Sequence, residues 1–306
     1  MAANISYTTD ELAQMLKVSK LTIYDLIKKG ELQAYRVGRQ MRVDAGELED
    51  YKVRSKETPQ EIKTADGGQE DKNNTSQIVI SGQDGSLDIL ARHLEKDTVY
   101  RPLRSYTGSL DSLIAMYKGE THIVSTHLFD GETLQYNIPY VRKLLVSKPF
   151  IVVRFLQREI GFYTAIGNPK NIQDWADLAR KDVMLVNREP GAGARVLLDE
   201  KLRLAGINRR QVHGYDNEQM SHQDVAAAVA AGKSDVGIGI KQVATSANIQ
   251  FVPLLTENYD LVMLADKFHL PLADKVLELL QQADFRERLA SLGYQIKDIG
   301  KIIWQQ

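Results

Sequence analysis

The chain has 306 residues, 43% of them hydrophobic, and a formal net charge of −1 from 39 Lys and Arg against 40 Asp and Glu. It contains no cysteine, which excludes disulfides, zinc–thiolate sites, iron–sulfur clusters and cysteine nucleophiles. Because no basic segment leads into an apolar one near residue 1 and no apolar stretch is long enough to span a bilayer, we expect a soluble cytoplasmic protein.

Residues 5–54 are expected to form a compact unit that contains three helix starts. Capping patterns place these starts at Thr8–Glu11, Ser19–Thr22 and Asp44–Glu47. Since only three residues separate the first two helices, the arrangement is typical of a helix-turn-helix. The apolar core of this unit is predicted to contain Leu12, Leu16, Val18, Ile23 and Leu26.

Two short strand-like runs, 32–37 and 40–44, follow the second helix and are joined by Gly38 and Arg39. They predict a hairpin, which beside a helix-turn-helix makes a wing. Between residues 20 and 42 the chain has six basic residues against Asp25 and Glu31. Such a cluster in a nearly neutral chain is the pattern expected for phosphate contacts, and the alternative is that these side chains only face solvent.

Four segments carry a resemblance to a known family. They are Tyr7-Thr-Thr-Asp-Glu-Leu-Ala, Val18-Ser-Lys-Leu-Thr-Ile-Tyr, Ile27-Lys-Lys-Gly-Glu-Leu and Tyr35-Arg-Val-Gly-Arg. The segments resemble the excisionase and MerR-like winged helix-turn-helix family, which implies a second helix in the major groove and a wing on the DNA backbone. The DNA-contacting residues implied are Ser19, Lys20, Thr22, Tyr24, Lys28, Arg36, Arg39 and Arg42.

Residues 55–76 contain a single large aliphatic side chain, Ile62. A segment this polar cannot repay the entropy of ordering, so a linker or a partly helical connector is expected. The predicted organisation is therefore a DNA-binding domain over 1–54, a linker over 55–76 and a ligand-sensing domain over 77–306.

From residue 77 onward, strand-like and helix-like segments alternate. Strands are expected at 78–81, 122–126, 162–166, 183–186, 235–239 and 261–264, with helices beginning at 85, 108, 195 and 224. This alternation predicts open α/β layers, in which ligands collect at the carboxyl ends of the strands.

Four loops in this region carry small residues or hydroxyls immediately before an expected helix. They are 81–86, 105–109, 191–194 and 221–224. Each loop alone is most simply explained as a helix cap, or for 191–194 as a plain connection between a strand and a helix. Together they favour a cleft lined by helix N-termini, where backbone N–H groups and hydroxyls hold a tetrahedral oxyanion.

The larger part of the chain also resembles a known fold. The segments that carry the resemblance are Gly108-Ser-Leu with Gly119-Glu, Ser125-Thr-His-Leu-Phe-Asp130, Gly167-Asn-Pro169, Val186-Asn-Arg188 with 191–199, Gly214-Tyr215 and 226–239. They resemble the two-lobed type II periplasmic-binding-protein fold, in the branch that is fused to helix-turn-helix regulators. Relatives include molybdate and tungstate carriers, so the resemblance implies an oxyanion sensor. Ala192 and Ala194 stand where that family often has hydroxyl residues.

The predicted ligand-binding residues come from these loops and their flanks. They are Ser81, Asp84, Gly108, Ser109, Arg188, Gly191, Gly193, Ala194, Arg195, Tyr215, Ser221 and His222. Because a guanidinium group also suits carboxylates and phosphates, Arg104, Arg188 and Arg195 leave an organic anion open. Surface solvation or an ion pair between lobes explains each arginine equally well.

The histidines give no sign of a metal site, because their spacing fits no set of metal ligands. They are interpreted as surface or hinge residues. His127 and Asp130 resemble a base and its orienting carboxylate, but no nucleophile motif accompanies them. We expect no cofactor, no metal and no enzymatic activity.

The sequence as a whole predicts a transcriptional regulator that binds operator DNA, senses molybdate or tungstate, and acts as a homodimer on a two-part site. Three alternatives stay open: a sensor of an organic anion, an architectural DNA-binding protein, and an enzyme that uses Arg188, Arg195 and His127 on a binding-protein fold. The chain is expected to cross between lobes near 158–161 and to return near 244–251.

Overall fold

The computed structural model describes residues 6–16, 23, 26–27, 32–37, 40–48, 51 and 76–306. The chain divides into two compact units, Met1–Glu70 and Asp71–Gln306. Within the described ranges, no helix is both long and apolar enough to span a membrane.

The N-terminal unit combines a short helix with a three-stranded antiparallel sheet, ordered β1-β3-β2. Its elements are β1 (Ser6–Thr8), α1 (Thr9–Leu16), β2 (Tyr35–Val37) and β3 (Gln40–Asp44), with further helical residues at 45–48 and 51. The capping box at the start of α1 is confirmed: the Thr8 N–H donates to Glu11 Oε2 at 2.8 Å, and the Glu11 N–H donates to Thr8 Oγ1 at 3.3 Å. The hairpin predicted as a wing is also confirmed, with Tyr35 opposite Arg42.

The core of this unit largely follows the sequence prediction. Buried side chains are Leu12, Ile23, Leu32, Val43 and Leu48, and Leu16 and Leu26 pack against them. Val18 and the expected DNA contacts Ser19, Lys20, Thr22, Tyr24, Lys28 and Arg39 lie outside the described residues, as do 55–75 of the expected linker and the Arg36 side chain. Arg42 is described, and its guanidinium donates to the carbonyl and hydroxyl oxygens of Ser6 at 3.3 and 3.2 Å.

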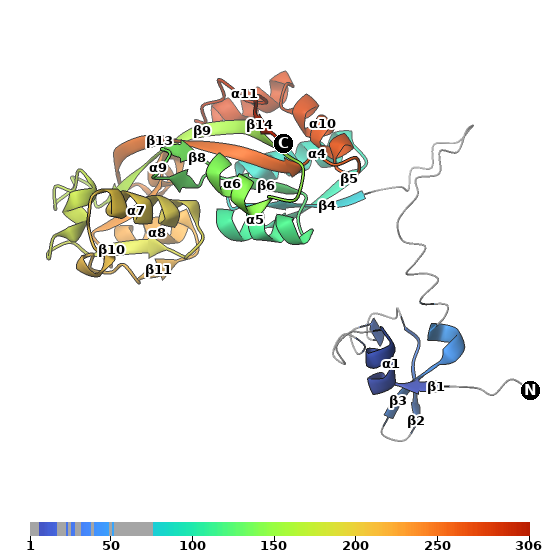
Figure 1. The fold of residues 1–306 in the computed structure, drawn as a ribbon. Coiled ribbons are helices and arrows are strands. Elements are labelled where there is room, and N and C mark those ends of the chain that lie inside the picture. Colours follow the sequence, from blue (N-terminus) through green and yellow to red (C-terminus); the bar gives the residue numbers. More distant parts are fainter. Residues whose placement is uncertain are drawn as a thin grey trace, which may run out of the picture. The chain divides into compact units, whose positions relative to one another are not determined.

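Residues 76–306 form a two-lobed α/β structure around one mixed sheet, ordered β11-β10-β12-β9-β13-β6-β4-β5, with β14 beside β9 (Figure 1). Parallel pairing joins β4 to β5 and β6, and β10 to β11 and β12. The strands are β4 (Ser76–Ser81), β5 (Tyr100–Ser105), β6 (Ile123–Thr126), β9 (Phe150–Thr164), β10 (Leu185–Arg188), β11 (Glu218–Gln219), β12 (Val236–Ile240), β13 (Gln250–Leu264) and β14 (Ile302–Gln305), and a separate pair is β7 (Phe129–Asp130) with β8 (Gln135–Tyr136).

The two lobes are joined by β9 and β13, which pair antiparallel along almost their whole lengths. Phe155, Leu156 and Tyr259 belong to the core of the first lobe. Ile160 and Leu255 belong to the core of the second. β9 therefore crosses between the lobes at 156–160, and β13 crosses back at 255–259. The crossing in β9 overlaps the range predicted from the sequence, 158–161. The expected return at 244–251 is wrong, because β13 first pairs with the end of β9 inside the second lobe.

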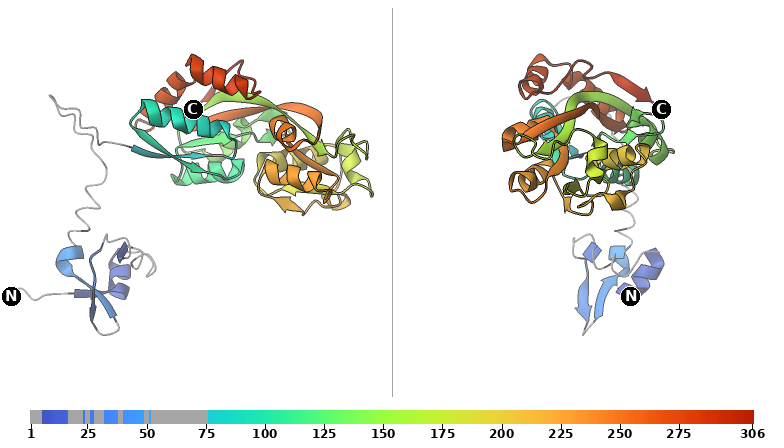
Figure 2. Two further views of the ribbon diagram at one scale, coloured as in Figure 1. Left: turned by 180° about the vertical axis from the view of Figure 1, so that it is seen from behind. Right: turned by 90° about the vertical axis from the view of Figure 1, so that its left-hand side faces the viewer.

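Helices cover the sheet in both lobes. The first lobe has α4 (Ser86–Asp97), α5 (Ser109–Lys118), α6 (Ile138–Leu144), α10 (Leu270–Leu279) and α11 (Ala283–Ser291), and the second has η1 (Trp175–Ala179), α7 (Gly193–Leu204), η2 (Arg209–Gln211), α8 (His222–Ala230) and α9 (Lys241–Ala247). Figure 2 shows α4, α10 and α11 packed together on one face of the first lobe. All four expected helices are present, and α5 ends as predicted at Gly119, which adopts the left-handed conformation at φ 82°.

β14 closes an edge of β9 in the first lobe. Ile302, Trp304 and Gln305 pair with Val153, Val152 and Ile151. β12 pairs with the other half of β9, from Ile160 to Thr164. β9 therefore has neighbours on both sides in both lobes.

Candidate ligand-binding cleft between the lobes

A cavity of about 20 Å³ lies where the two lobes meet the crossing strands. The first lobe lines it with residues 82–84 after β4, residues 107–109 at the start of α5, and Ser125 and His127 at the end of β6. The crossing strands contribute Arg158 and Tyr259, and the second lobe contributes Gly193 and His222. Both lobes therefore contribute to one enclosed site.

Three helices begin at this cavity, because Ser109, Gly193 and His222 are the first residues of α5, α7 and α8. A helix N-terminus directs free N–H groups and partial positive charge toward whatever lies beyond it. Three helix N-termini therefore lie at one cavity, and two of their first-turn N–H groups are already engaged, that of Leu110 with the Gly191 carbonyl and that of Asp224 with the Ser221 hydroxyl. The Ser109 hydroxyl adds another polar group, since no described residue hydrogen-bonds to it.

Glycines let the two lobes approach closely here. The Leu110 N–H donates to the Gly191 carbonyl at 3.1 Å across the cleft. A Cβ at Gly108 would lie 3.0 Å from the Gly191 carbonyl carbon, and one at Gly193 would lie 2.5 Å from the His127 ring. Any larger residue at Gly193 would therefore displace either the His127 ring or the start of α7.

Arg158 is the charged centre of the cavity and is only 2% exposed. Its Nε donates to Glu257 Oε1 at 2.6 Å, its NH1 group donates to Asp84, and its guanidinium stacks on the Tyr259 ring. The NH2 group donates to none of the residues that the structure describes. Arg158 is thus held rigidly from two sides while one edge of the guanidinium stays open to a ligand.

Asp84 and Glu257 are both held ionised by this arrangement. Burial acts to raise the pKa of the Asp84 carboxyl, but Arg158 and hydrogen bonds from Ser86 and Tyr294 bring it below its usual range. Burial likewise opposes ionisation of Glu257, yet His127 and Arg158 lower its pKa. The charge of Arg158 is therefore already compensated, and an anion would be held mainly by directed N–H and hydroxyl groups.

Two histidines belong to this site: His222, which is among the predicted ligand residues, and His127, whose interpretation as a surface or hinge residue is wrong. His127 Nδ1 lies 3.0 Å from Glu257 Oε2 and not against Asp130, which instead accepts from Thr133. Burial lowers the pKa of His222 well below 6.5, and the charges of Arg188 and Arg158 lower it further. His222 is therefore neutral near pH 7, and its Nδ1 has no hydrogen-bond partner among the described residues.

Of the predicted ligand residues, Asp84, Gly108, Ser109, Gly193 and His222 line the cavity. Four others support its walls without lining it. The Ser81 hydroxyl bonds to those of Thr107 and Ser112, the Gly191 carbonyl accepts from α5, Ala194 packs in the second lobe's core, and Ser221 caps α8.

Arg188, Arg195 and Tyr215 do not line the cavity, which corrects the expectation for these three residues. Arg188 pairs with Glu189 at 2.8 Å and also reaches Gln83 of the first lobe. Arg195 donates to the Arg188 carbonyl at 2.9 Å and stacks on the Tyr215 ring. Arg188 uses its Nε and Nη2 donors and Arg195 its Nε and Nη1 donors on neighbouring groups, including Gln219 of β11 and Glu218. Arg104 likewise pairs with Asp88 at 3.0 Å.

Several lining residues are not among those predicted from the sequence, namely Gly82, Gln83, Thr107, Ser125, Arg158 and Tyr259. The available signal is a group of charges within largely apolar strands, Arg154, Arg158 and Glu159 in β9 and Glu257 and Asp260 in β13, and it does not single out Arg158. No group of His, Asp and Glu suited to a metal ion occurs among the described residues.

Comparisons with known proteins agree with this architecture. Residues 91–281 match the PBP superfamily domain, and residues 6–54 match a helix-turn-helix domain. The chain is 47% identical over 307 residues to the uncharacterized protein YvgK of Bacillus subtilis (strain 168), covering 97% of each chain.

Solved structures share the fold at low identity. A putative phosphate ABC transporter substrate-binding protein with bound phosphate from Clostridium perfringens has a TM-score of 0.54 at 14% identity, covering 72% of this chain and 99% of that one. The tungstate ABC transporter from Geobacter sulfurreducens has a TM-score of 0.53 at 12% identity, covering 71% and 98%. The two-lobed binding-protein fold predicted from the sequence is confirmed.

Proposed function

The chain belongs to the PBP superfamily and carries an N-terminal helix-turn-helix domain, and on this basis we propose that it is a transcriptional regulator that responds to a small oxyanion. The observation that carries this proposal is the convergence of three helix N-termini and the open edge of Arg158 on one cavity. N–H donors from several directions suit a compact tetrahedral anion. We propose molybdate or tungstate as that anion.

The size of the cavity supports a ligand-dependent movement. One water molecule needs about 10–15 Å³ of such space, and the cavity offers about 20 Å³. A tetrahedral oxyanion is larger, so it requires the lobes to stand farther apart than they do here. Ligand binding would then select one lobe arrangement over another, which is the differential affinity that a switch requires.

The N-terminal unit supports the DNA-binding half of the proposal. The described part has the cap of the first helix and the hairpin of the wing. The proposed DNA contacts are Ser19, Lys20, Thr22, Tyr24, Lys28, Arg36, Arg39 and Arg42, used by a homodimer on a two-part operator. We propose that residues 1–54 form the DNA-binding domain, 55–76 the linker and 77–306 the ligand-sensing domain.

The test is a calorimetric titration of the full chain with molybdate, tungstate, sulfate and phosphate, followed by DNA mobility shifts with and without the anion that binds. We expect heat from molybdate or tungstate and a changed DNA affinity in its presence. If none of the four anions gives heat, the oxyanion proposal is wrong. If an anion binds but never changes the DNA shift, the protein is an architectural DNA-binding protein.

A further inference from the structure

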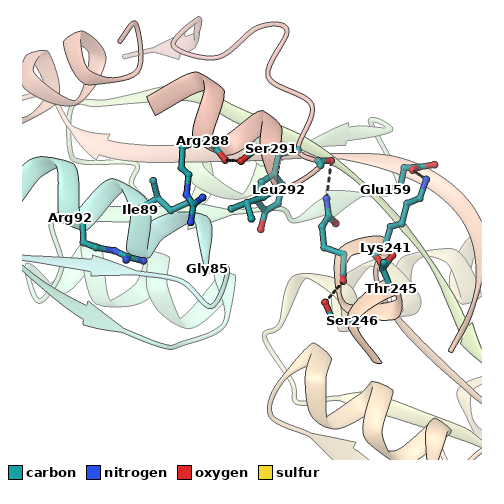
Figure 3. A pocket seen from close by; sticks show the side chains of 13 residues that line it. Gly85, Ile89, Arg92, Glu159, Lys241, Thr245, Ser246, Arg288, Ser291 and Leu292 are labelled. Atoms are coloured by element: carbon teal, nitrogen blue, oxygen red, sulfur yellow. Dashed lines mark hydrogen bonds and ion pairs between the residues drawn. The ribbon is translucent and has the colours of Figure 1, made fainter. Parts of the chain in front are cut away.

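A groove of about 670 Å³ lies on the other face of the crossing strands and shares no lining residue with the cavity (Figure 3). Neighbouring residues of a strand point to opposite faces. Accordingly, Arg158 of β9 lines the cavity while Glu159 lines the groove. The remaining walls come from α4 and α11 of the first lobe and α9 of the second. A volume of this order is typical of sites for small organic ligands.

The groove holds two arginines, Arg92 and Arg288, that form no ion pair with a carboxylate of the described residues. Lys241 is paired with Glu159 at 2.5 Å. Arg92 donates from Nε to the Asp88 carbonyl of its own helix, and the Arg288 guanidinium donates to none of the residues that the structure describes. Figure 3 shows both arginine side chains extending from their helices toward the end of the groove near Gly85.

The same two arginines border an adjoining hollow of about 300 Å³, together with Ile89. The carboxylate there, Asp284, lies 3.7 Å from His93 Nε2 and makes no ion pair with either arginine. Arg92 and Arg288 are therefore the cations of this region without an ion-pair partner among the described residues, and the exposed Asp284 carboxylate offsets part of their charge. Two guanidinium groups from different helices suit a dianionic phosphate, which accepts hydrogen bonds from several directions.

The rest of the groove fits an organic body attached to such a phosphate. Ile89 and Leu292 supply apolar surface beside the arginines. Gln242 donates from Nε2 to the Gly293 carbonyl at 3.1 Å, while its Oε1 is buried without a hydrogen-bond partner among the described residues. We propose that this groove binds a small phosphorylated organic molecule, with its phosphate on Arg92 and Arg288 and its body over Ile89 and Leu292.

The groove is placed to influence the cavity. Tyr294 lines the groove, and its hydroxyl donates to Asp84 at 2.7 Å, the carboxylate that holds Arg158. Gln242 of the second lobe and Gly293 of the first make a contact across it. A ligand that touches both lobes binds one lobe arrangement better than another and thereby changes the affinity of the cavity. This regulatory consequence rests on the proposed function, whereas binding in the groove does not.

The test is a calorimetric titration of the full chain, without any oxyanion, with AMP, 3-phosphoglycerate and glucose 6-phosphate. Adenosine, glycerate and glucose serve as the counterparts that lack phosphate. We expect at least one phosphorylated probe to bind at least about tenfold more tightly than its counterpart, since charge-assisted hydrogen bonds contribute about 1.5–3 kcal/mol. Absence of heat from all three phosphorylated probes would overturn the proposal.

Matched variants then locate the site. Arg288→Gln should weaken the probe at least about tenfold, whereas Arg210→Gln, an exposed arginine of η2 outside the groove, should leave it unchanged. Equal weakening by both variants would mean nonspecific attraction and would contradict the site. Molybdate titrations on the same variants keep the two proposals apart, because Arg288→Gln leaves every residue of the cavity intact.

Discussion

Arg158 of β9 donates to Glu257 of β13 at 2.6 Å, at the level where both strands pass from one lobe to the other. Both side chains are almost completely buried. The ion pair therefore has two roles, since it ties the crossing strands together and fixes the guanidinium edge that faces the cavity.

Replacing Arg158 by Gln should both destabilise the C-terminal unit and abolish oxyanion binding. Removing one partner leaves Asp84 and Glu257 uncompensated, which costs about 3–5 kcal/mol for a buried pair. The unfolding of this unit is followed by tryptophan fluorescence in urea, because Trp175 and Trp304 are the two tryptophans of the chain and both lie in it.

The matched control is Arg154→Gln. Arg154 pairs with Asp260 at 2.5 Å between the same two strands but does not line the cavity. The Arg154→Gln variant should have a lower free energy of unfolding than the unmodified protein but the same affinity for the oxyanion. If both variants lose binding equally, Arg158 acts through stability alone.

Gly193→Leu should abolish oxyanion binding and leave DNA binding unchanged, because its side chain would collide with the His127 ring and occupy the cavity that the oxyanion needs. A Cβ at Gly85 meets nothing within 4 Å, so Gly85→Ala is the corresponding neutral change. Calorimetry and DNA mobility shifts measure the two activities. Loss of both in Gly193→Leu would mean that the turn is only structural.

Stability should fall with acidification below about pH 6.5 because of His222. Its pKa in the folded state is well below 6.5, so in this window the unfolded chain binds a proton that the folded chain does not. The loss of stability grows as the pH falls from about 6.5 toward the folded-state pKa of His222. Urea unfolding of His222→Gln should lack this part of the loss, and identical pH profiles for the two proteins would contradict the prediction.

Further acidification should remove a second contribution to the free energy of unfolding, from Asp84 and Glu257. The pKa values of Asp84 and Glu257 lie below their ordinary values of 3.8 and 4.5 in the folded state. Their stabilisation is therefore complete above these ordinary values and is lost as pH falls through the folded-state pKa values. Glu257→Gln should show a flatter acid limb in the same unfolding measurement, although it is less stable at pH 7.

Arg39→Gln should weaken binding to a nonspecific DNA duplex and reduce the slope of log affinity against log salt by about one. The prediction follows from the place of Arg39 at the tip of the predicted wing. Arg101→Gln, an exposed arginine of β5 in the C-terminal unit, is the control and should leave the salt slope as it is. If the unmodified protein, Arg39→Gln and Arg101→Gln all have the same salt slope, Arg39 is not part of the DNA interface.

Local signals in the sequence predicted what local interactions determine. The capping box of Thr8 and Glu11 and the helix end at Gly119 depend on residues a few positions apart, and both are present. The place of Gly193 in the site could also be predicted from a local pattern, because a glycine-rich turn before a helix places N–H groups at one point.

The rest of the site depends on pairings between distant segments. Arg158 and Tyr259 meet because β9 and β13 cross in register, which no local pattern encodes. Arg188 and Arg195 carry the right chemistry for an anion but turn toward β11 and toward each other. The direction of a side chain is set by the partners around it, and those partners are known only once the sheet order is known.

The pairing of β14 along β9 also has a bearing on solubility. Without residues 302–305, the backbone N–H and C=O groups of Ile151–Val153 on that side would become an open strand edge, next to apolar residues. Open edges of this kind recruit strands from other molecules and promote aggregation. Truncations and tags near Gln306 therefore put the solubility of the whole chain at risk, and changes at the other end of the sequence avoid that hazard.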